Sequence, residues 1–97
     1  MGDEELANEI LGKFLEDAPR KFTALKEALD NGDIGLVQRE PHTLKGASAN
    51  IGAVSLQEMA YQIEVAGEAR DLVKAGSLAA QLDKQFEVLK KLAQPDF

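Results

Sequence analysis

The sequence predicts an all-α fold, an antiparallel up-down four-helix bundle with a short or kinked helical leader at its N-terminus. Apolar residues recur at spacings of three and four, which is the period of an amphipathic helix. No segment of useful length alternates with the period of two that is typical of a strand. Four amphipathic segments joined by short polar turns bury their apolar faces most simply in such a bundle.

The first helix is predicted over residues 6–29, with Pro19 inside it. Because Pro19 lacks a backbone N–H and crowds the carbonyl of Leu15, we expect a kink that divides a short leader from the main helix. The turn that follows ends this element. Gly32 suits the left-handed position after a helix, and Asp33 suits the N-cap of the next one.

The second helix is predicted from about Ile34 to about Ile51. Its apolar stripe recurs at spacings of four, three, four and three: Val37, Pro41, Leu44, Ser48 and Ile51. At about 100° per residue, His42 lies roughly 140° from the centre of this stripe. We therefore expect the His42 side chain to face solvent.

The third helix is predicted to open with a capping box formed by Ser55 and Glu58 and to end near Arg70. Its core stripe comprises Leu56, Met59, Ala60, Ile63, Ala66 and Gly67. A polar interval that reaches Gly76 and Ser77 is expected to lead to the last helix. The apolar face of that helix comprises Leu78, Leu82, Phe86, Leu89 and Leu92, with Pro95 beyond its end.

Length and composition exclude several classes of protein. A chain of 97 residues suits one domain, here expected over residues 1–97. Without cysteine and with a single histidine, disulfide frameworks and multi-histidine metal sites are not expected. The net charge of -6 disfavours nucleic acid and anionic membrane surfaces. Because no stretch is apolar enough to span a membrane and the first residues are acidic, we expect a cytoplasmic protein without direct membrane insertion. We also expect a monomer.

The residues around His42 could carry chemistry. Lys45 and Gly46 flank it one turn later, at about -60° and +40° on the helical wheel, and Ala49 and Ala53 lie within about 20° of it. A solvent-facing imidazole is largely neutral at neutral pH, so its ring nitrogen is a competent nucleophile for phosphorus. Lys45 could neutralise phosphoryl oxygens. Gly46 disfavours a helix by roughly 1 kcal/mol relative to alanine, which suggests that a partner approaches closely there.

Other readings remain open from these residues. An exposed histidine is ordinarily a surface residue, and the chain could be a non-catalytic helical protein-interaction module in which His42 is incidental. A carboxylate-bridged metal enzyme is disfavoured, because such bundles place Glu three residues before His and position 39 is Arg. A serine hydrolase is disfavoured as well, since no Gly-x-Ser-x-Gly turn follows a strand.

Residues 42–53, HTLKGASANIGA, closely resemble the signature of histidine phosphotransfer (HPt) domains of bacterial phosphorelays, including those of hybrid sensor kinases. The resemblance extends to the leader FLEDAP at residues 14–19, the turn at residues 31–33 and YQIE at residues 61–64. It implies a phosphorelay intermediate without autonomous kinase activity. The expected partners are response-regulator receiver domains and a hybrid sensor histidine kinase, with Mg²⁺ on the receiver and no cofactor on this chain.

By this resemblance His42 is the phosphoryl acceptor, Lys45 is the charge partner of the phosphate and Gly46 provides clearance for a docking receiver. The family's third helix often places a polar residue near the imidazole, and Glu64 matches that place better than Gln62. The expected docking surface contains Gln38, Arg39, Gly46, Ala49, Ala53 and Glu64.

Pro41 departs from the family pattern, which usually has a small non-proline residue before the histidine. Pro41 removes the donor to the Val37 carbonyl, so the helix either bends there or begins anew with Pro41 in its first turn. We favour a bent but continuous helix, because Val37 continues the core stripe.

Overall fold

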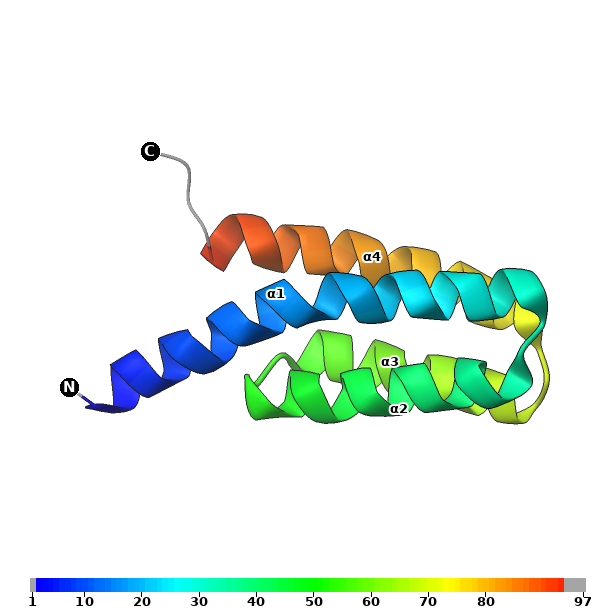
Figure 1. Cartoon of the computed structure of the whole chain (residues 1–97), viewed down its shortest axis with the longest axis horizontal. Helices are drawn as coiled ribbons and strands as arrows, with labels where there is room; N and C mark the ends of the chain where they lie inside the picture. The colour runs from blue at the N-terminus through cyan, green and yellow to red at the C-terminus, as the bar shows by residue number, and fades with distance from the viewer. Residues whose placement is uncertain (1, 94–97) are drawn as a thin grey trace.

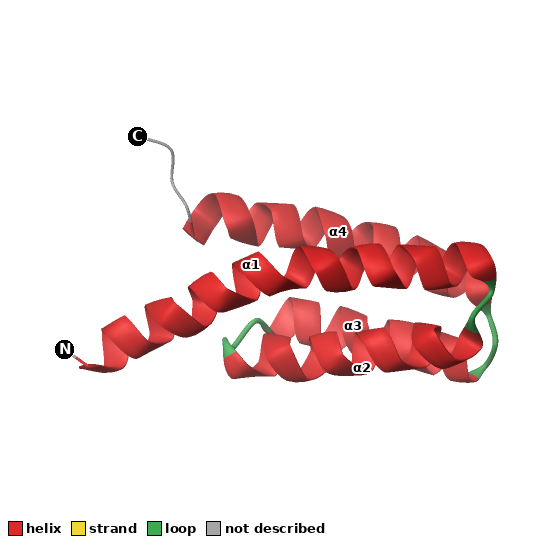
Figure 2. Cartoon of the chain, in the orientation of Figure 1, coloured by secondary structure: helices red, strands yellow, loops and turns green. Residues whose placement is uncertain are grey.

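The computed structural model describes residues 2–93, with side chains described over residues 9–92. Within that part of the chain there are four α-helices and no strand: α1 (Gly2–Asn31), α2 (Ile34–Asn50), α3 (Val54–Glu68) and α4 (Leu72–Ala93). Successive helices run in opposite directions (Figure 1) and are joined by short loops (Figure 2). The predicted antiparallel up-down bundle is confirmed.

The helix α1 continues through Pro19 as one element, so the leader is not a separate helix. Figure 1 shows the N-terminal half of α1 running obliquely to the bundle, while its C-terminal half lies along the other helices. The chain then reverses at Gly32, which has a φ of 68°. The carboxylate of Asp33 accepts the Leu36 N–H at 3.2 Å and caps α2, as the sequence predicts.

One apolar core runs through all four helices. It includes three aromatic rings: the ring centroid of Phe86 on α4 lies 4.8 Å from that of Phe22 on α1, edge to face, and 6.0 Å from that of Phe14. Four of the five residues predicted for the stripe of α2 are buried: Val37, Pro41, Leu44 and Ser48. The fifth, Ile51, is the C-cap of α2 and is partly buried. Edge-to-face rings contribute beyond the burial of their area, so these contacts hold α1 against α4.

The predicted start of α3 is wrong. Gly52 has a φ of 71° and reverses the chain, after which the Ala53 N–H donates to the Ser48 carbonyl at 2.9 Å. Ala53 therefore takes the N-cap position, without a side-chain cap, and Ser55 lies already inside the helix. Glu58 accepts a hydrogen bond from Gln62 at 3.5 Å instead of closing a capping box.

The predicted start of α4 is also wrong, because the helix begins at Leu72 and includes Gly76. The carboxylate of Asp71 accepts the Lys74 N–H at 3.1 Å, which caps the helix and allows it to start early. At the other end, Leu92 is 77% exposed rather than part of the core. It lies on the rim of a shallow groove between the end of α4 and the start of α3. The prediction for Pro95 lies outside the described residues.

No helix in the described part of the chain combines the length and the apolar character that crossing a membrane requires.

Candidate functional site

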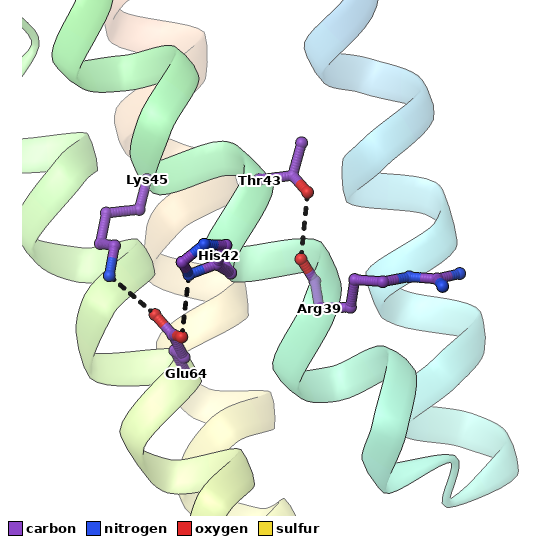
Figure 3. A network of polar contacts seen from close by, with 5 residues as sticks. All are labelled: Arg39, His42, Thr43, Lys45 and Glu64. Atoms are coloured by element: carbon purple, nitrogen blue, oxygen red, sulfur yellow. Dashed lines mark hydrogen bonds and ion pairs between the residues drawn. The ribbon is translucent and has the colours of Figure 1, made fainter.

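His42 projects from the solvent side of α2. Its neighbours Pro41 and Leu44 are buried, whereas the His42 side chain is 66% exposed. Figure 3 shows the imidazole pointing from α2 toward α3. The exposure predicted for His42 from the helical period is therefore found in the structure.

Glu64 connects His42 to Lys45. Its Oε2 lies 3.0 Å from His42 Nδ1, and its Oε1 accepts a hydrogen bond from Lys45 Nζ at 3.0 Å. The Glu64 side chain is 16% exposed. Both oxygens of one nearly buried carboxylate on α3 thus face side chains of α2 (Figure 3).

The sequence left two candidates for the polar residue near the imidazole. The structure places Glu64 there, while Gln62 is exposed and donates to Glu58. The reason is the rotation of α3, which turns residue 64 toward α2 and residue 62 toward solvent.

The surroundings of Glu64 favour its charged form. Burial by itself raises the pKa of the Glu64 carboxyl, but the hydrogen bonds from Lys45 and His42 and the nearby positive charge outweigh burial and lower the pKa below its ordinary value. Glu64 is therefore ionised at neutral pH. An ionised carboxylate only accepts hydrogen bonds, so it selects the form of His42 in which Nδ1 carries the proton.

This arrangement makes the other ring nitrogen of His42 the nucleophilic one. When Nδ1 carries the proton of a neutral imidazole, Nε2 keeps a free lone pair. The contact with Glu64 occupies Nδ1, and two thirds of the side chain is exposed. The site can thus present an oriented nitrogen nucleophile to a molecule approaching from solvent.

Lys45 is held against α3. Its side chain is 29% exposed, and its ammonium also lies over the ring of Tyr61, 5.2 Å from the ring centroid. Sequence reasoning did not assign Tyr61 to the site. The available signal was its position three residues before Glu64, because residues at this spacing are neighbours on a helix surface.

The close approach of α3 to α2 depends on Gly67. A Cβ atom at this buried position would lie 3.1 Å from Val37 Cγ1, 3.3 Å from Gln38 Cγ and 3.3 Å from the Val37 carbonyl oxygen. Gln38 Nε2 also donates to the Gly67 carbonyl at 3.4 Å. Gln38 therefore takes part in the contact between these helices.

Pro41 lies inside α2, which continues from Ile34 to Asn50, so no new helix begins at this proline. Proline has no N–H to offer the Val37 carbonyl. That carbonyl faces Gly67, whose missing side chain leaves room for it. The Val37 carbonyl, to which Pro41 offers no donor, thus lies at the contact between α2 and α3.

Gly46 lies on the free surface beside His42. Nothing lies within 4 Å of the position that a Cβ atom would occupy there, so no contact within the bundle requires a glycine. Ala49 and Arg39 are exposed and Ala53 is partly buried. Thr43 Oγ1 donates to the Arg39 carbonyl at 3.2 Å, a bond within α2 (Figure 3).

Among the described residues, no three histidine, cysteine or acidic side chains come together in a way that could hold a metal ion. The polar centre of the site consists of one carboxylate, one ammonium and one imidazole.

Comparisons with known proteins agree with this geometry. Histidine-containing phosphotransfer protein 2 of Arabidopsis thaliana is 26% identical over an alignment of 99 positions, gaps included, which covers 99% of this chain and 64% of that protein. The chain thus spans less than two thirds of that relative. The crystal structure of histidine-containing phosphotransfer protein B (HptB) from Pseudomonas aeruginosa PAO1 matches with a TM-score of 0.87 and 29% identity, over 96% of this chain and 79% of that one.

The family model described as the Hpt domain matches residues 9–92, which include all of α2 and α3 with His42, Lys45 and Glu64. The match covers most of the chain and agrees with the exposed histidine on α2 and with the four-helix bundle. This protein therefore belongs to the Hpt domain family.

Proposed function

We propose that this protein is a phosphorelay intermediate in two-component signal transduction. In this function His42 accepts a phosphoryl group from the aspartyl phosphate of a receiver domain, or from a kinase, and passes it to another receiver domain. The observation that carries the proposal is the contact between His42 Nδ1 and Glu64 Oε2 at 3.0 Å, on a side chain that is 66% exposed. The contact orients the imidazole, and the exposure leaves it within reach of a partner.

The transfer step needs no external acid or base, because no proton has to be added or removed. The Nε2 lone pair of His42 attacks phosphorus, an N–P bond forms, and the bond between phosphorus and the aspartyl oxygen breaks to release a carboxylate. The product is an imidazolium that keeps its proton on Nδ1, where Glu64 accepts the hydrogen bond. In the onward transfer an aspartate of the second receiver attacks phosphorus, and neutral imidazole leaves.

Lys45 is the proposed charge partner of the phosphoryl group. Phosphoryl transfer depends mainly on positioning and on stabilising the charge of the phosphoryl oxygens. Lys45 follows His42 by three residues and lies on the same side of α2, which supports this assignment. Mg²⁺ would be supplied by the receiver, so we propose no cofactor and no autonomous kinase activity for this chain.

The proposed docking surface surrounds His42. Gly46 and Ala49 are exposed and small, and Arg39 adds a cation on the preceding turn. The free space at Gly46 supports its assignment as clearance for a receiver. Gln38 and Glu64 would act at the edge of this surface, next to α3. Ala53 lies beyond the end of α2, as the N-cap of α3, and lines a groove with Leu56 and Leu89, so the helical wheel of α2 does not place it beside His42 and its docking role stays a prediction.

The test is incubation of the chain with a phosphorylated receiver domain and Mg²⁺, followed by intact-mass analysis. We expect one added phosphoryl group that is labile in acid, and none in His42→Gln. Because the sequence contains one histidine, detection of phosphohistidine also locates the group. Full labelling of His42→Gln would contradict the proposal, and unchanged binding of a partner to this variant without any labelling would favour a plain interaction module.

A further inference from the structure

The ammonium of Lys45 contacts two side chains of α3, Glu64 and Tyr61. Nζ is 3.0 Å from Glu64 Oε1 and 5.2 Å from the centroid of the Tyr61 ring, within the range of about 6 Å at which a ring face attracts a cation. Tyr61 itself is 48% exposed and lies at the surface of the bundle. Two contacts with α3 thus hold Lys45 at the edge of the proposed docking surface.

The two contacts differ in their effect on the charge of Lys45. A carboxylate neutralises an ammonium, whereas an aromatic face attracts it through a quadrupole and carries no net charge. The carboxylate of Glu64 is also shared with His42. An imidazolium formed at His42 would compete with Lys45 for Glu64, but the Tyr61 ring would continue to hold the ammonium.

We propose that Tyr61 is a positioning residue for phosphotransfer, whose ring holds the Lys45 ammonium beside His42 without neutralising the charge that phosphoryl oxygens require. This assignment rests on the proposed function of His42 and Lys45. It adds to the site a residue that touches neither the reacting nitrogen nor the carboxylate in the contacts described above.

The first measurement is the rate at which a phosphorylated receiver transfers its phosphoryl group to the wild type and to three variants. Tyr61→Phe keeps the ring face and should retain the wild-type rate. Tyr61→Leu removes it and should slow the transfer about two- to fivefold, the factor that corresponds to ~0.5–1 kcal/mol for an exposed cation–π contact. Val73→Ala, which trims an exposed apolar side chain on α4, serves as a control and should leave the rate unchanged.

The second measurement separates an action through Lys45 from direct contact with the receiver. In a Lys45→Ala background, Tyr61→Leu should have no further effect on the rate, because the ammonium that the ring holds is gone. An equal slowing in both backgrounds would mean that the ring acts by touching the receiver, and it would overturn the proposal.

The third measurement requires no phosphotransfer. The ring current of Tyr61 should shift the NMR signals of the Lys45 ε-methylene protons upfield in the wild type and in Tyr61→Phe, and this shift should be lost in Tyr61→Leu. Absence of the shift in the wild type would overturn the contact.

If the wild type is labelled at His42 and Tyr61→Leu is labelled equally fast, this proposal alone fails. If the wild type is not labelled at all, the proposed function fails and the role of Tyr61 fails with it.

Discussion

Nδ1 of His42 lies 3.0 Å from Oε2 of Glu64, although the two residues are 22 positions apart in the sequence. A carboxylate on α3 thus orients an imidazole on α2. Lys45 Nζ donates a hydrogen bond to the other Glu64 oxygen, Oε1, at 3.0 Å, and this second contact keeps the carboxylate from rotating away from His42. The reactivity proposed for His42 therefore depends on the packing of two helices as well as on the histidine itself.

Replacing Glu64 by glutamine should slow phosphorylation of His42 several-fold. A glutamine amide can donate or accept, so it no longer selects the imidazole form with the proton on Nδ1. Nitrogen-15 NMR of the histidine ring should show mainly the Nδ1–H form in the wild type and a mixture in Glu64→Gln. Glu58→Gln, an exposed change on the same helix, is the matched control and should change neither the spectrum nor the rate.

The contribution of Glu64 to stability should depend on pH. The folded protein lowers the pKa of Glu64 below its ordinary value of 4.5, so the ionised form is stabilised by folding. This stability is fully present above pH 4.5 and is lost as the pH falls through the lowered value. Thermal melts should therefore show an advantage of the wild type over Glu64→Gln at neutral pH that shrinks in acid. Parallel stability curves down to about pH 3 would contradict the lowered pKa.

Gly46→Gln should strengthen the fold and weaken the docking of a receiver. Glutamine is a better helix former than glycine, and free space surrounds this position, so the free energy of unfolding should rise by up to about 1 kcal/mol. The long side chain beside His42 should slow transfer from the receiver. Gly12→Gln is the matched control, because Gly12 is also exposed inside a helix and has nothing within 4 Å. It should stabilise the protein without slowing transfer, and a large loss of stability in Gly46→Gln would refute the clearance role.

Gly67→Ala should destabilise the fold, whereas Gly46→Gln should stabilise it. The added methyl group would meet Val37 Cγ1 at 3.1 Å and the Val37 carbonyl oxygen at 3.3 Å. Because Val37 is fully buried and its backbone cannot yield easily, we expect a loss of about 1 to 3 kcal/mol in the free energy of unfolding.

The same variant tests the link between helix spacing and the site. If α3 moves away from α2, the Nδ1–H form of His42 should become less dominant in the nitrogen-15 spectrum. Val37→Ala in the Gly67→Ala background removes the Cγ1 atom and should partly restore the population of the Nδ1–H form of His42. A Gly67→Ala variant as stable as the wild type would show that the helices can separate without loss.

The sequence alone determined the helices and the exposure of His42, because both follow from local periodicity. The apolar residues from Val37 to Ser48 follow a single helical period only if α2 is continuous through Pro41. This period places His42 on the side of α2 opposite to the apolar stripe. The cap at Asp33 is also local, since its carboxylate meets an N–H three residues later.

The starts of α3 and α4 were misplaced because competing local signals were present. Ser55 and Glu58 have the spacing of a capping box, but the reversal at Gly52 places Ala53 at the N-cap, so that α3 already begins at Val54. Gly76 suggests a loop, yet the cap at Asp71 and the buried Ala75 keep that segment helical. Bonds formed by the neighbouring turns decided both boundaries.

Only the tertiary structure decided which residues of α3 complete the site. Residues 61, 62 and 64 are all polar or aromatic, and the helical period alone does not determine how α3 is rotated against α2. The core contacts of Ile63 and the close approach at Gly67 set that rotation, so that Glu64 meets His42 and Lys45 while Tyr61 lies under the ammonium. The physical reason is that a contact between two helices depends on their spacing and rotation, which the packing of the whole bundle fixes and a single helix cannot.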